Sequence, residues 1–251
     1  MKCEGMKLTN KILPRTLWFA DYDGSLCPHL EVWEPRNYDS QQIFSVLESL
    51  QSASLGVFWN TGRRPESLGG VNADYLKLPG YFIHGTVYHD PTKGDAVQSP
   101  LLAAETTKHF QEQLENSKKF NLEIKATSLR VAPVKIQYLD LLKEWVGLHP
   151  ASSGWEWRVG HRGVELLPVG FSKAISLTKE LARHPKALPV AIGDEILDRP
   201  AIELALKHGG WAILVGESCG WITEVPHKPD QLIICQEPSD VLRVLQSLLK
   251  K

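Results

Sequence analysis

The stretch Leu17-Trp18-Phe19-Ala20-Asp21-Tyr22-Asp23-Gly24-Ser25-Leu26 joins four apolar residues to a short acidic segment. An uninterrupted apolar run that ends in a polar turn is typical of a buried strand in a parallel sheet. Asp21 and Asp23 are two residues apart, so on an extended backbone both side chains point the same way. The stretch therefore predicts a strand over Leu17–Ala20 with two carboxylates at its carboxyl end, where open α/β sheets bind their ligands.

The segment Asp21–Gly24 by itself fits more than one kind of site. Asp-x-Asp-Gly can be a turn that caps the next segment. A calcium loop that starts at Asp21 would need glycine at its sixth position and glutamate at its twelfth, where this chain has Leu26 and Val32, so that interpretation fails. Two close carboxylates repel each other unless a cation or a shared proton lies between them, which favours a metal-assisted reaction with one aspartate as nucleophile and the other as acid or base.

Composition limits the class of protein. The chain has 251 residues, of which 43% are hydrophobic and 23% charged, and its formal net charge is -1. These values are ordinary for a globular protein, and without a basic block we expect no nucleic-acid partner. No apolar stretch approaches the ~20 residues of a membrane span, and the N-terminus has no signal-peptide core, so we expect no membrane partner. The four scattered cysteines indicate free thiols, which favours a cytoplasmic location.

Strands and helices alternate at both ends of the chain, whereas the middle has a different pattern. At the ends, helices are expected over Asp39–Ala53, Ser172–His184, Pro200–His208 and Ser239–Leu249, and buried strands over Leu55–Trp59, Tyr81–His84, Leu188–Ile192 and Trp211–Val215. In the middle, we expect helices over Leu101–Phe120 and Tyr138–Val146, strands over Leu122–Ala126 and Leu129–Ala132, and a hairpin of Trp155–Val159 and Gly163–Leu167. The pattern predicts an α/β fold, with a doubly wound parallel-sheet core domain (residues 1–99 and 169–251) and an inserted α+β cap domain (residues 100–168).

Three further element boundaries carry polar residues suited to phosphate chemistry. Thr61 and Gly62 follow the second predicted strand, where a hydroxyl and backbone N–H groups can hold a phosphate oxygen. Lys173 lies in the first turn of a predicted helix, where the helix dipole disfavours a cation. The segment Gly193–Asp198 follows another strand and offers the acidic oxygens that Mg²⁺ prefers. Taken singly, each feature also fits a capped turn or an exposed lysine.

In the order Asp-x-Asp, Thr, Lys and Gly-Asp-x-x-x-Asp, the four motifs resemble those of the haloacid dehalogenase (HAD) superfamily of phosphohydrolases. The resemblance covers nearly the whole chain, and it implies a HAD-like core with a type C2 cap inserted between the second and third motifs. A finer similarity is to the trehalose-6-phosphate phosphatases. It rests on the segments Asn60–Arg64, Ile83–Gly85, Leu122–Lys125, Gly163–Pro168 and Pro238–Val241.

The resemblance implies catalytic roles for four residues. Asp21 would attack phosphorus and form an aspartyl-phosphate. Asp23 would protonate the leaving sugar oxygen and then deprotonate the water that hydrolyses the intermediate. Thr61 would hydrogen-bond the transferring phosphoryl group, and Lys173 would neutralise the phosphate and the nucleophile.

The resemblance also implies a Mg²⁺ site and a substrate site. The implied metal ligands are Asp21, the backbone carbonyl of Asp23, and Asp194, with Glu195 and Asp198 outside them to orient ligands and waters. The candidate substrate-binding residues are Gly62, Arg63, His84, Glu123, Lys125, Arg158 and Glu165. The tryptophans Trp145, Trp155 and Trp157 could offer a surface for a sugar, although tryptophans in a small domain are more often core.

The expected function is therefore Mg²⁺-dependent hydrolysis of a small-molecule sugar phosphate, with trehalose 6-phosphate as the first candidate. The chain departs from that family at Thr61, where the family usually has serine, and at Glu195, where it usually has aspartate. These departures leave open a sucrose, glucosylglycerate or mannosylglycerate phosphate. A phosphosugar mutase and a non-catalytic phosphosugar sensor are further alternatives, and phosphate release separates both from a phosphatase.

Overall fold

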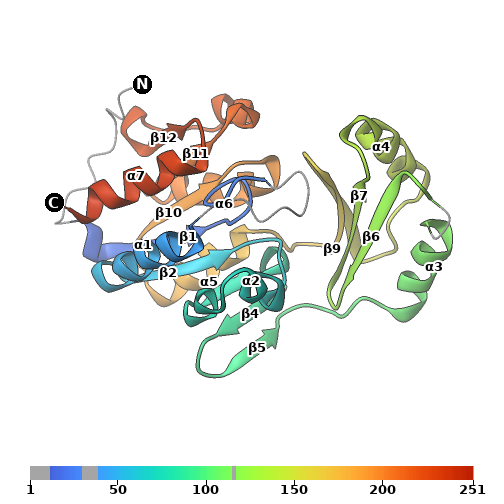
Figure 1. The fold of residues 1–251 in the computed structure, drawn as a ribbon, viewed down its shortest axis with the longest axis horizontal. Coiled ribbons are helices and arrows are strands. Elements are labelled where there is room, and N and C mark those ends of the chain that lie inside the picture. The colour runs from blue at the N-terminus through green and yellow to red at the C-terminus, as the bar shows by residue number, and fades with distance from the viewer. Residues whose placement is uncertain (1–11, 30–38, 115–116, 251) are drawn as a thin grey trace. The chain divides into compact units, whose positions relative to one another are not determined.

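The computed structural model describes residues 12–29, 39–114 and 117–250. The chain divides into two compact units, one formed by Met1–Ala96 with Ser172–Lys251 and the other by Val97–Phe171. We call them the core unit and the inserted unit (Figure 1). Within the described ranges, no helix is both long enough and apolar enough to cross a lipid bilayer.

A single sheet organises the core unit. In the described part of the chain its eight strands lie in the order β12-β11-β10-β1-β2-β3-β4-β5 (Figure 1). They are β1 (Thr16–Ala20), β2 (Gly56–Asn60), β3 (Gly80–Phe82), β4 (Val87–Asp90), β5 (Gly94–Val97), β10 (Leu188–Gly193), β11 (Trp211–Val215) and β12 (Leu232–Cys235). The strands from β12 to β3 are parallel, and β4 is antiparallel to β3. Strand order reverses between β1 and β10, and such a switch point is where open sheets bind ligands.

Helices cover both faces of this sheet. They are α1 (Ser40–Ala53), α5 (Ala174–Arg183), α6 (Arg199–Lys207) and α7 (Pro238–Leu249). Apolar residues of α1 and α7 join one buried cluster, and those of α5 and α6 join a second cluster. In β1, Trp18 belongs to the first cluster while Leu17 and Phe19 belong to the second, and all three are fully buried. A strand buried on both faces has to be apolar throughout. The predicted doubly wound α/β fold is confirmed.

The strand expected over Tyr81–His84 is shorter than predicted. It ends at Phe82, because Ile83 and His84 have left-handed backbone conformations with φ of 49° and 54°. An extended ladder cannot continue through such residues. The chain turns there through a short 3₁₀ helix, Ile83–Gly85.

The helix expected over Leu101–Phe120 was also predicted too long. It is α3 (Ala104–Leu114), and the backbone N–H of Leu102 donates instead to the carbonyl of Ala126 at 2.9 Å. Phe120 begins a strand, and residues 115 and 116 lie outside the described residues. The sequence patterns did not predict α2 (Pro65–Val71), β4, β5 or β12.

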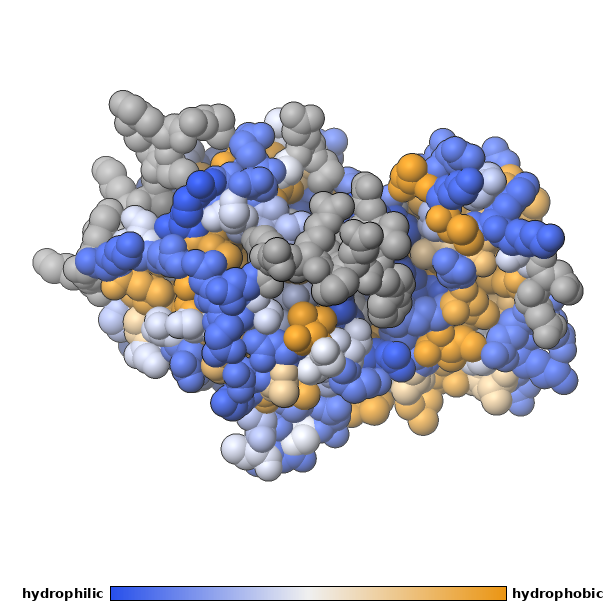
Figure 2. Space-filling model, in the orientation of Figure 1, coloured by the Kyte–Doolittle hydropathy of each residue, from blue (hydrophilic) through white to orange (hydrophobic). Residues whose placement is uncertain are grey.

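In its described residues, the inserted unit is a four-stranded antiparallel sheet with two helices. The strands β6 (Phe120–Lys125), β7 (Ser128–Pro133), β8 (Trp155–Gly160) and β9 (Gly163–Pro168) lie in the order β6-β7-β9-β8, and the second helix is α4 (Leu139–Leu148). Buried residues of α3, α4, β7 and β9 form its core, and Trp145, Trp155 and Trp157 pack against that core. The tryptophans are therefore partly buried, and each covers part of the core of this unit. Other apolar side chains, such as Ile136 and Leu148, are exposed, and hydrophobic residues are visible on the surface of both units (Figure 2).

Candidate active site

Asp21 is the first residue after β1, and its carboxylate is buried. Its backbone N–H donates to the carbonyl of Ile192 in β10 at 3.2 Å, which ties it to the switch point of the sheet. Its Oδ2 lies 3.1 Å from Nζ of Lys173. Burial raises the pKa of Asp21 well above its usual range, the ammonium of Lys173 lowers it, and the carboxylates of Asp198 and Asp194 raise it again.

Lys173 immediately precedes α5 and is 2% exposed. Its ammonium donates to Oδ1 of Asp198 at 2.6 Å, and its backbone carbonyl accepts hydrogen bonds from Asn60 Nδ2 at 3.1 Å and Ser176 Oγ at 2.6 Å. Burial alone lowers the pKa of Lys173, but the carboxylates of Asp198 and Asp21 outweigh burial and raise that pKa above its usual value. A buried, protonated lysine therefore lies between two carboxylates.

Asp194 and Asp198 come from the loop between β10 and α6. Oδ2 of Asp198 accepts the backbone N–H groups of Asp194 and Glu195, each at 3.1 Å, so the loop folds back on itself. A Cβ atom on Gly193 would lie 2.4 Å from Cγ of Asp198, so only glycine leaves room for this carboxylate. One oxygen each of Asp21, Asp194 and Asp198 lie within 4.8 Å of one another.

A divalent cation fits these three carboxylates. Their donors are all hard oxygens, which Mg²⁺ prefers over nitrogen and sulfur ligands. All three aspartates are buried, and repulsion among them contributes to the raised pKa of Asp21. The Asp198 carboxylate accepts three hydrogen bonds, two from backbone N–H groups at Oδ2 and one from Lys173 at Oδ1. That bonding suits a residue that orients the site from just outside the metal.

Asp23 is paired with Arg63 across two loops. The guanidinium binds the carboxylate with two bonds, Nε to Oδ2 at 2.6 Å and Nη2 to Oδ1 at 2.7 Å. The guanidinium also lies over the ring of Tyr22, 5.1 Å from its centroid. Paired N–H bonds of this kind fix the orientation of a carboxylate. Arg63, which the sequence predicts to bind substrate, here positions the predicted acid/base residue.

Thr61, Gly62 and His84 lie together beyond β2 and β3. Thr61 is buried, its backbone N–H donates to the carbonyl of Tyr81 at 3.0 Å, and its hydroxyl oxygen accepts the backbone N–H of Arg63 at 3.3 Å. A Cβ atom on Gly62 would lie 2.8 Å from Nε2 of His84, so glycine permits the imidazole to approach the loop. Because β1 and β2 are paired through Ala20 and Trp59, this loop follows the strand next to the one that ends at Asp21.

The four substrate residues predicted in the inserted unit lie on one face of its sheet. The cross-strand pairs Glu123–Arg130, Arg130–Glu165 and Glu165–Arg158 form a row of alternating charge across all four strands. Lys125, two residues from Glu123, shares this face, and its Nζ lies 3.2 Å from Oε1 of Glu165 with both side chains buried. Arg130 completes the row, although no sequence motif selected it.

Two residues of the core site were also missed by sequence reasoning. The hydroxyl of Ser25 donates to Oδ1 of Asp194 at 3.1 Å, and the amide of Asn60 binds the carbonyl of Lys173. Both lie in segments that the sequence singles out, Asp21–Leu26 and Asn60–Arg64. Their partners are more than 100 residues away along the chain, so no local pattern indicates the contacts.

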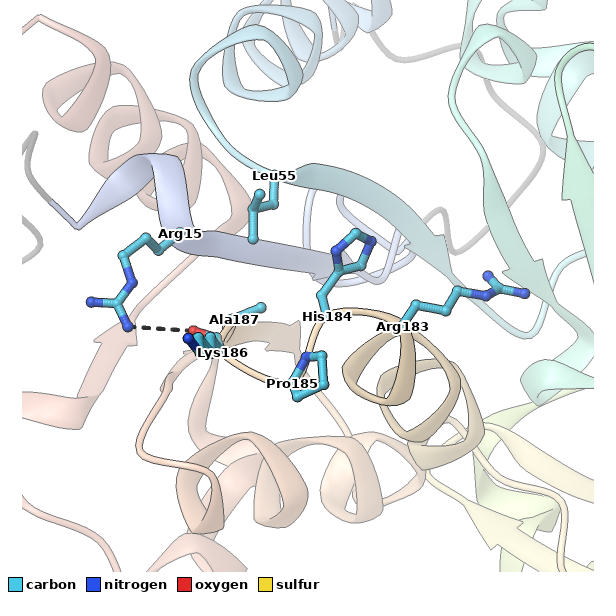
Figure 3. A pocket seen from close by; sticks show the side chains of 7 residues that line it. All are labelled: Arg15, Leu55, Arg183, His184, Pro185, Lys186 and Ala187. Carbon is cyan, nitrogen blue, oxygen red and sulfur yellow. Dashed lines mark hydrogen bonds between the residues drawn. The ribbon is translucent and has the colours of Figure 1, made fainter.

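A pocket of about 370 Å³ lies at the opposite end of the strands. It is lined by Arg15, Leu55, Arg183, His184, Pro185, Lys186 and Ala187 (Figure 3). These residues precede β1, β2 and β10 or end α5, whereas Asp21, Thr61 and Asp194 follow the strands. Figure 3 shows Arg15 and Arg183 extending to opposite sides, and each is already bonded, to the carbonyl of Lys186 and to Glu180. The pocket is separate from the acidic cluster.

Comparison of the sequence with protein-family models and with curated proteins gives no match. Solved structures do match, among them the C-terminal domain of C. albicans trehalose-6-phosphate phosphatase, with a TM-score of 0.71, 18% identity and coverage of 100% of this chain and 99% of that chain. Haloacid dehalogenase-like hydrolases from B. subtilis and Bacteroides thetaiotaomicron match with TM-scores of 0.67 and 0.65 and identities of 14% and 13%, each over 93% of this chain and 99% of theirs. At such identities the similarity concerns the fold, and the chain has the fold of the haloacid dehalogenase-like hydrolases.

Proposed function

We propose that the protein is a Mg²⁺-dependent phosphatase that hydrolyses a sugar phosphate through a phosphorylated Asp21. The observation that carries this proposal is the buried cluster of Asp21, Lys173, Asp194 and Asp198 at the switch point of the sheet. Several buried charges in one place are costly to stability, and they are found where chemistry requires them. The likeness to haloacid dehalogenase-like hydrolases supports the same class of reaction.

In the first half of the reaction, a carboxylate oxygen of Asp21 attacks phosphorus, and the bond from phosphorus to the sugar oxygen breaks. Asp23 gives a proton to that leaving oxygen. Lys173, 3.1 Å from Asp21, opposes the effect of burial by favouring the ionised form of the nucleophile, and it offsets the charge of the phosphoryl group. Thr61 donates a hydrogen bond from its hydroxyl group to a phosphoryl oxygen. Mg²⁺ held by Asp21, Asp194 and the backbone carbonyl of Asp23 would supply further positive charge against the phosphate.

In the second half, Asp23 takes a proton from water, and the water oxygen bonds to phosphorus. The bond between phosphorus and Asp21 then breaks, which releases phosphate and restores the carboxylate. Arg63 keeps Asp23 in one orientation through both halves, because its two hydrogen bonds fix the carboxylate plane. Asp198 and Glu195 hold the loop that carries Asp194.

For the substrate, we propose a phosphorylated sugar, with trehalose 6-phosphate as the first to test. The likeness to the C. albicans trehalose-6-phosphate phosphatase domain supports this choice. The charged face of the inserted unit, with Glu123, Lys125, Arg130, Arg158 and Glu165, offers both hydrogen-bond acceptors and donors. Such a surface suits sugar hydroxyls, which both donate and accept.

The proposal is tested first by phosphate release from an aryl phosphate with Mg²⁺. We expect Asp21→Asn to lower the rate at least about 10³-fold, because it removes the nucleophile. Asp230→Asn is the matched control. Asp230 is exposed and lies outside the acidic cluster, so this variant should leave the rate unchanged. EDTA should abolish turnover and added Mg²⁺ should restore it. Substantial activity in Asp21→Asn contradicts the proposed nucleophile.

The substrate is tested by a panel of disaccharide, hexose and glycerate-linked sugar phosphates at fixed Mg²⁺. We expect one disaccharide phosphate to exceed the aryl phosphate in kcat/KM, because only a sugar can use the charged face of the inserted unit. If no sugar phosphate has a higher kcat/KM than the aryl phosphate, the proposed sugar substrate is ruled out. The proposed phosphatase chemistry is not affected by that result.

A further inference from the structure

The carboxylate of Asp194 is held by two side chains from the loop after β1. The hydroxyl of Ser25 donates to Oδ1 at 3.1 Å, and Nε2 of His29 lies 2.8 Å from Oδ2. The main chain of Asp194 is bound as well, because the thiol of Cys219 donates to its carbonyl at 3.2 Å and its N–H donates to Asp198. Ser25 and His29 have no role in the reaction described above, so their contacts with Asp194 need another explanation.

The chemistry of this contact defines its direction. A carboxylate that binds a metal is ionised and has only acceptor oxygens, so in the metal-bound state that we propose Nε2 of His29 carries the hydrogen and donates it to Asp194. The side chain of His29 is 29% exposed and that of Asp194 only 8%, so the bond closes one side of a buried carboxylate. Such a bond is strong, because the acceptor is charged and shielded from water.

The contact is also enclosed by the motif that carries the nucleophile. A Cβ atom on Gly24 would lie 2.2 Å from Oδ2 of Asp194 and 2.3 Å from Nε2 of His29. Gly24 has φ of 76°, which favours glycine in any case. The turn after β1 therefore passes directly over the hydrogen bond, and it leaves no space for a larger residue between the two side chains.

We propose that His29 is a positioning residue of the metal site, which fixes Oδ2 of Asp194 and so sets the affinity of the site for Mg²⁺. This inference rests on the metal-dependent function proposed above. Asp194 comes from the loop after β10, whereas His29 follows β1, so the bond joins the two strand ends that carry the acidic cluster. Loss of a hydrogen-bond partner behind a metal ligand typically weakens metal binding about 10–100-fold.

The test is the Kd for Mg²⁺ measured by calorimetry on the full chain without substrate. His29→Phe keeps a ring of similar size and removes the donor, and we expect it to weaken Mg²⁺ binding about 10–100-fold. His29→Gln keeps an N–H donor and should recover most of the loss. The control is His208→Phe. His208 is exposed, and its Nδ1 lies 2.9 Å from the carbonyl oxygen of Leu204 in the preceding helix. This variant should bind Mg²⁺ as the wild type does.

Three results overturn the inference: His29→Phe binding as tightly as the wild type, His29→Phe binding more tightly, or His29→Gln binding as weakly as His29→Phe. Melting of the metal-free variants, followed by circular dichroism, shows whether each is folded, and His29→Ala replaces His29→Phe if that variant fails to fold. Calorimetry measures Mg²⁺ binding without turnover. A wild-type protein that binds Mg²⁺ but releases no phosphate therefore contradicts only the proposed phosphatase activity. An active phosphatase whose Kd is unchanged in His29→Phe contradicts only the role of His29.

Discussion

At the scale of single residues, the candidate site is a balance of buried charges. Lys173 is the ammonium that lies between Asp21 and Asp198, at 3.1 Å and 2.6 Å. Each of these groups would be costly to bury alone, because a charge loses its hydration when it leaves water. The charges offset one another when all are present. Removal of one group leaves another buried charge without compensation, which lowers the free energy of unfolding.

Lys173→Met should therefore destabilise the metal-free protein by about 3–5 kcal/mol, because it leaves buried carboxylates without their cation. Mg²⁺ should raise the free energy of unfolding of this variant by more than it raises that of the wild type, since a second cation would replace the lost charge. The measurement is urea denaturation with and without Mg²⁺. Lys179→Met, at a neighbouring lysine of α5, is the control. Equal free energies of unfolding for Lys173→Met and the wild type would contradict the charge-balance explanation.

The raised pKa of Asp21 predicts how stability depends on pH. A raised pKa means that the folded protein keeps a proton that the unfolded chain releases above about pH 4. As the pH rises from there through the folded-state pKa, ionisation of Asp21 costs stability in the metal-free protein. Asp21→Asn cannot ionise, so its stability relative to the wild type should grow with pH over that window. Urea denaturation without metal at about pH 4 and about pH 7 measures the difference, and a constant difference contradicts the prediction.

At the scale of elements, the site depends on loops at the ends of neighbouring strands. Asp21 follows β1, Thr61 and Arg63 follow β2, and Asp194 follows β10. Parallel pairing of these strands brings the three loops to one edge of the sheet. The pair of Arg63 and Asp23 then joins the loop after β2 to the turn after β1.

Arg63→Ala should lower kcat about 10–100-fold with little change in KM, because a loosened Asp23 loses its orientation for proton transfer. Arg63→Lys should recover little, since an ammonium cannot make two parallel bonds. Steady-state kinetics on an aryl phosphate make the measurement, with Arg64→Ala as the neighbouring control. If instead KM rises and kcat is unchanged, Arg63 binds the substrate, as its sequence motif suggests.

At the scale of the whole molecule, we propose that chemistry belongs to the core unit and substrate recognition to the inserted unit. The acidic cluster belongs entirely to the core unit, and the row of alternating charge belongs entirely to the inserted unit. Changes in the two units should therefore separate in kinetics. A core change should affect every phosphate ester, and a change in the inserted unit should affect sugar esters alone.

Glu123→Gln should lower kcat/KM for the best sugar phosphate about 10-fold or more, because it removes a charged acceptor for hydroxyl groups. The same variant should hydrolyse an aryl phosphate at the wild-type rate. Lys143→Gln, on the exposed surface of α4, controls for changes in the inserted unit as a whole. An equal loss on both substrates would contradict the division of roles between the units.

Local patterns in the sequence determined the class of fold and the chemical character of the core site. The apolar run Leu17–Ala20 has to be buried on both faces, and this requirement alone indicates a parallel sheet with helices on each side. Polar motifs after parallel strands meet at one edge of that sheet, so the cluster of Asp21, Asp194 and Asp198 could be expected without coordinates. The start of a helix could be predicted too, since Asp39, the first residue of the expected helix Asp39–Ala53, caps α1 by accepting the N–H of Gln42.

Only the tertiary structure decided which side chains meet. The pairing of Arg63 with Asp23 and the contact of His29 with Asp194 both depend on residues brought together from distant parts of the chain. The row through Glu123 and Arg130 likewise depends on the register of four strands. Sequence periodicity reports which face of an element is buried, but hydrogen bonds require atoms within about 3 Å, and that closeness arises only when the strands and loops are packed.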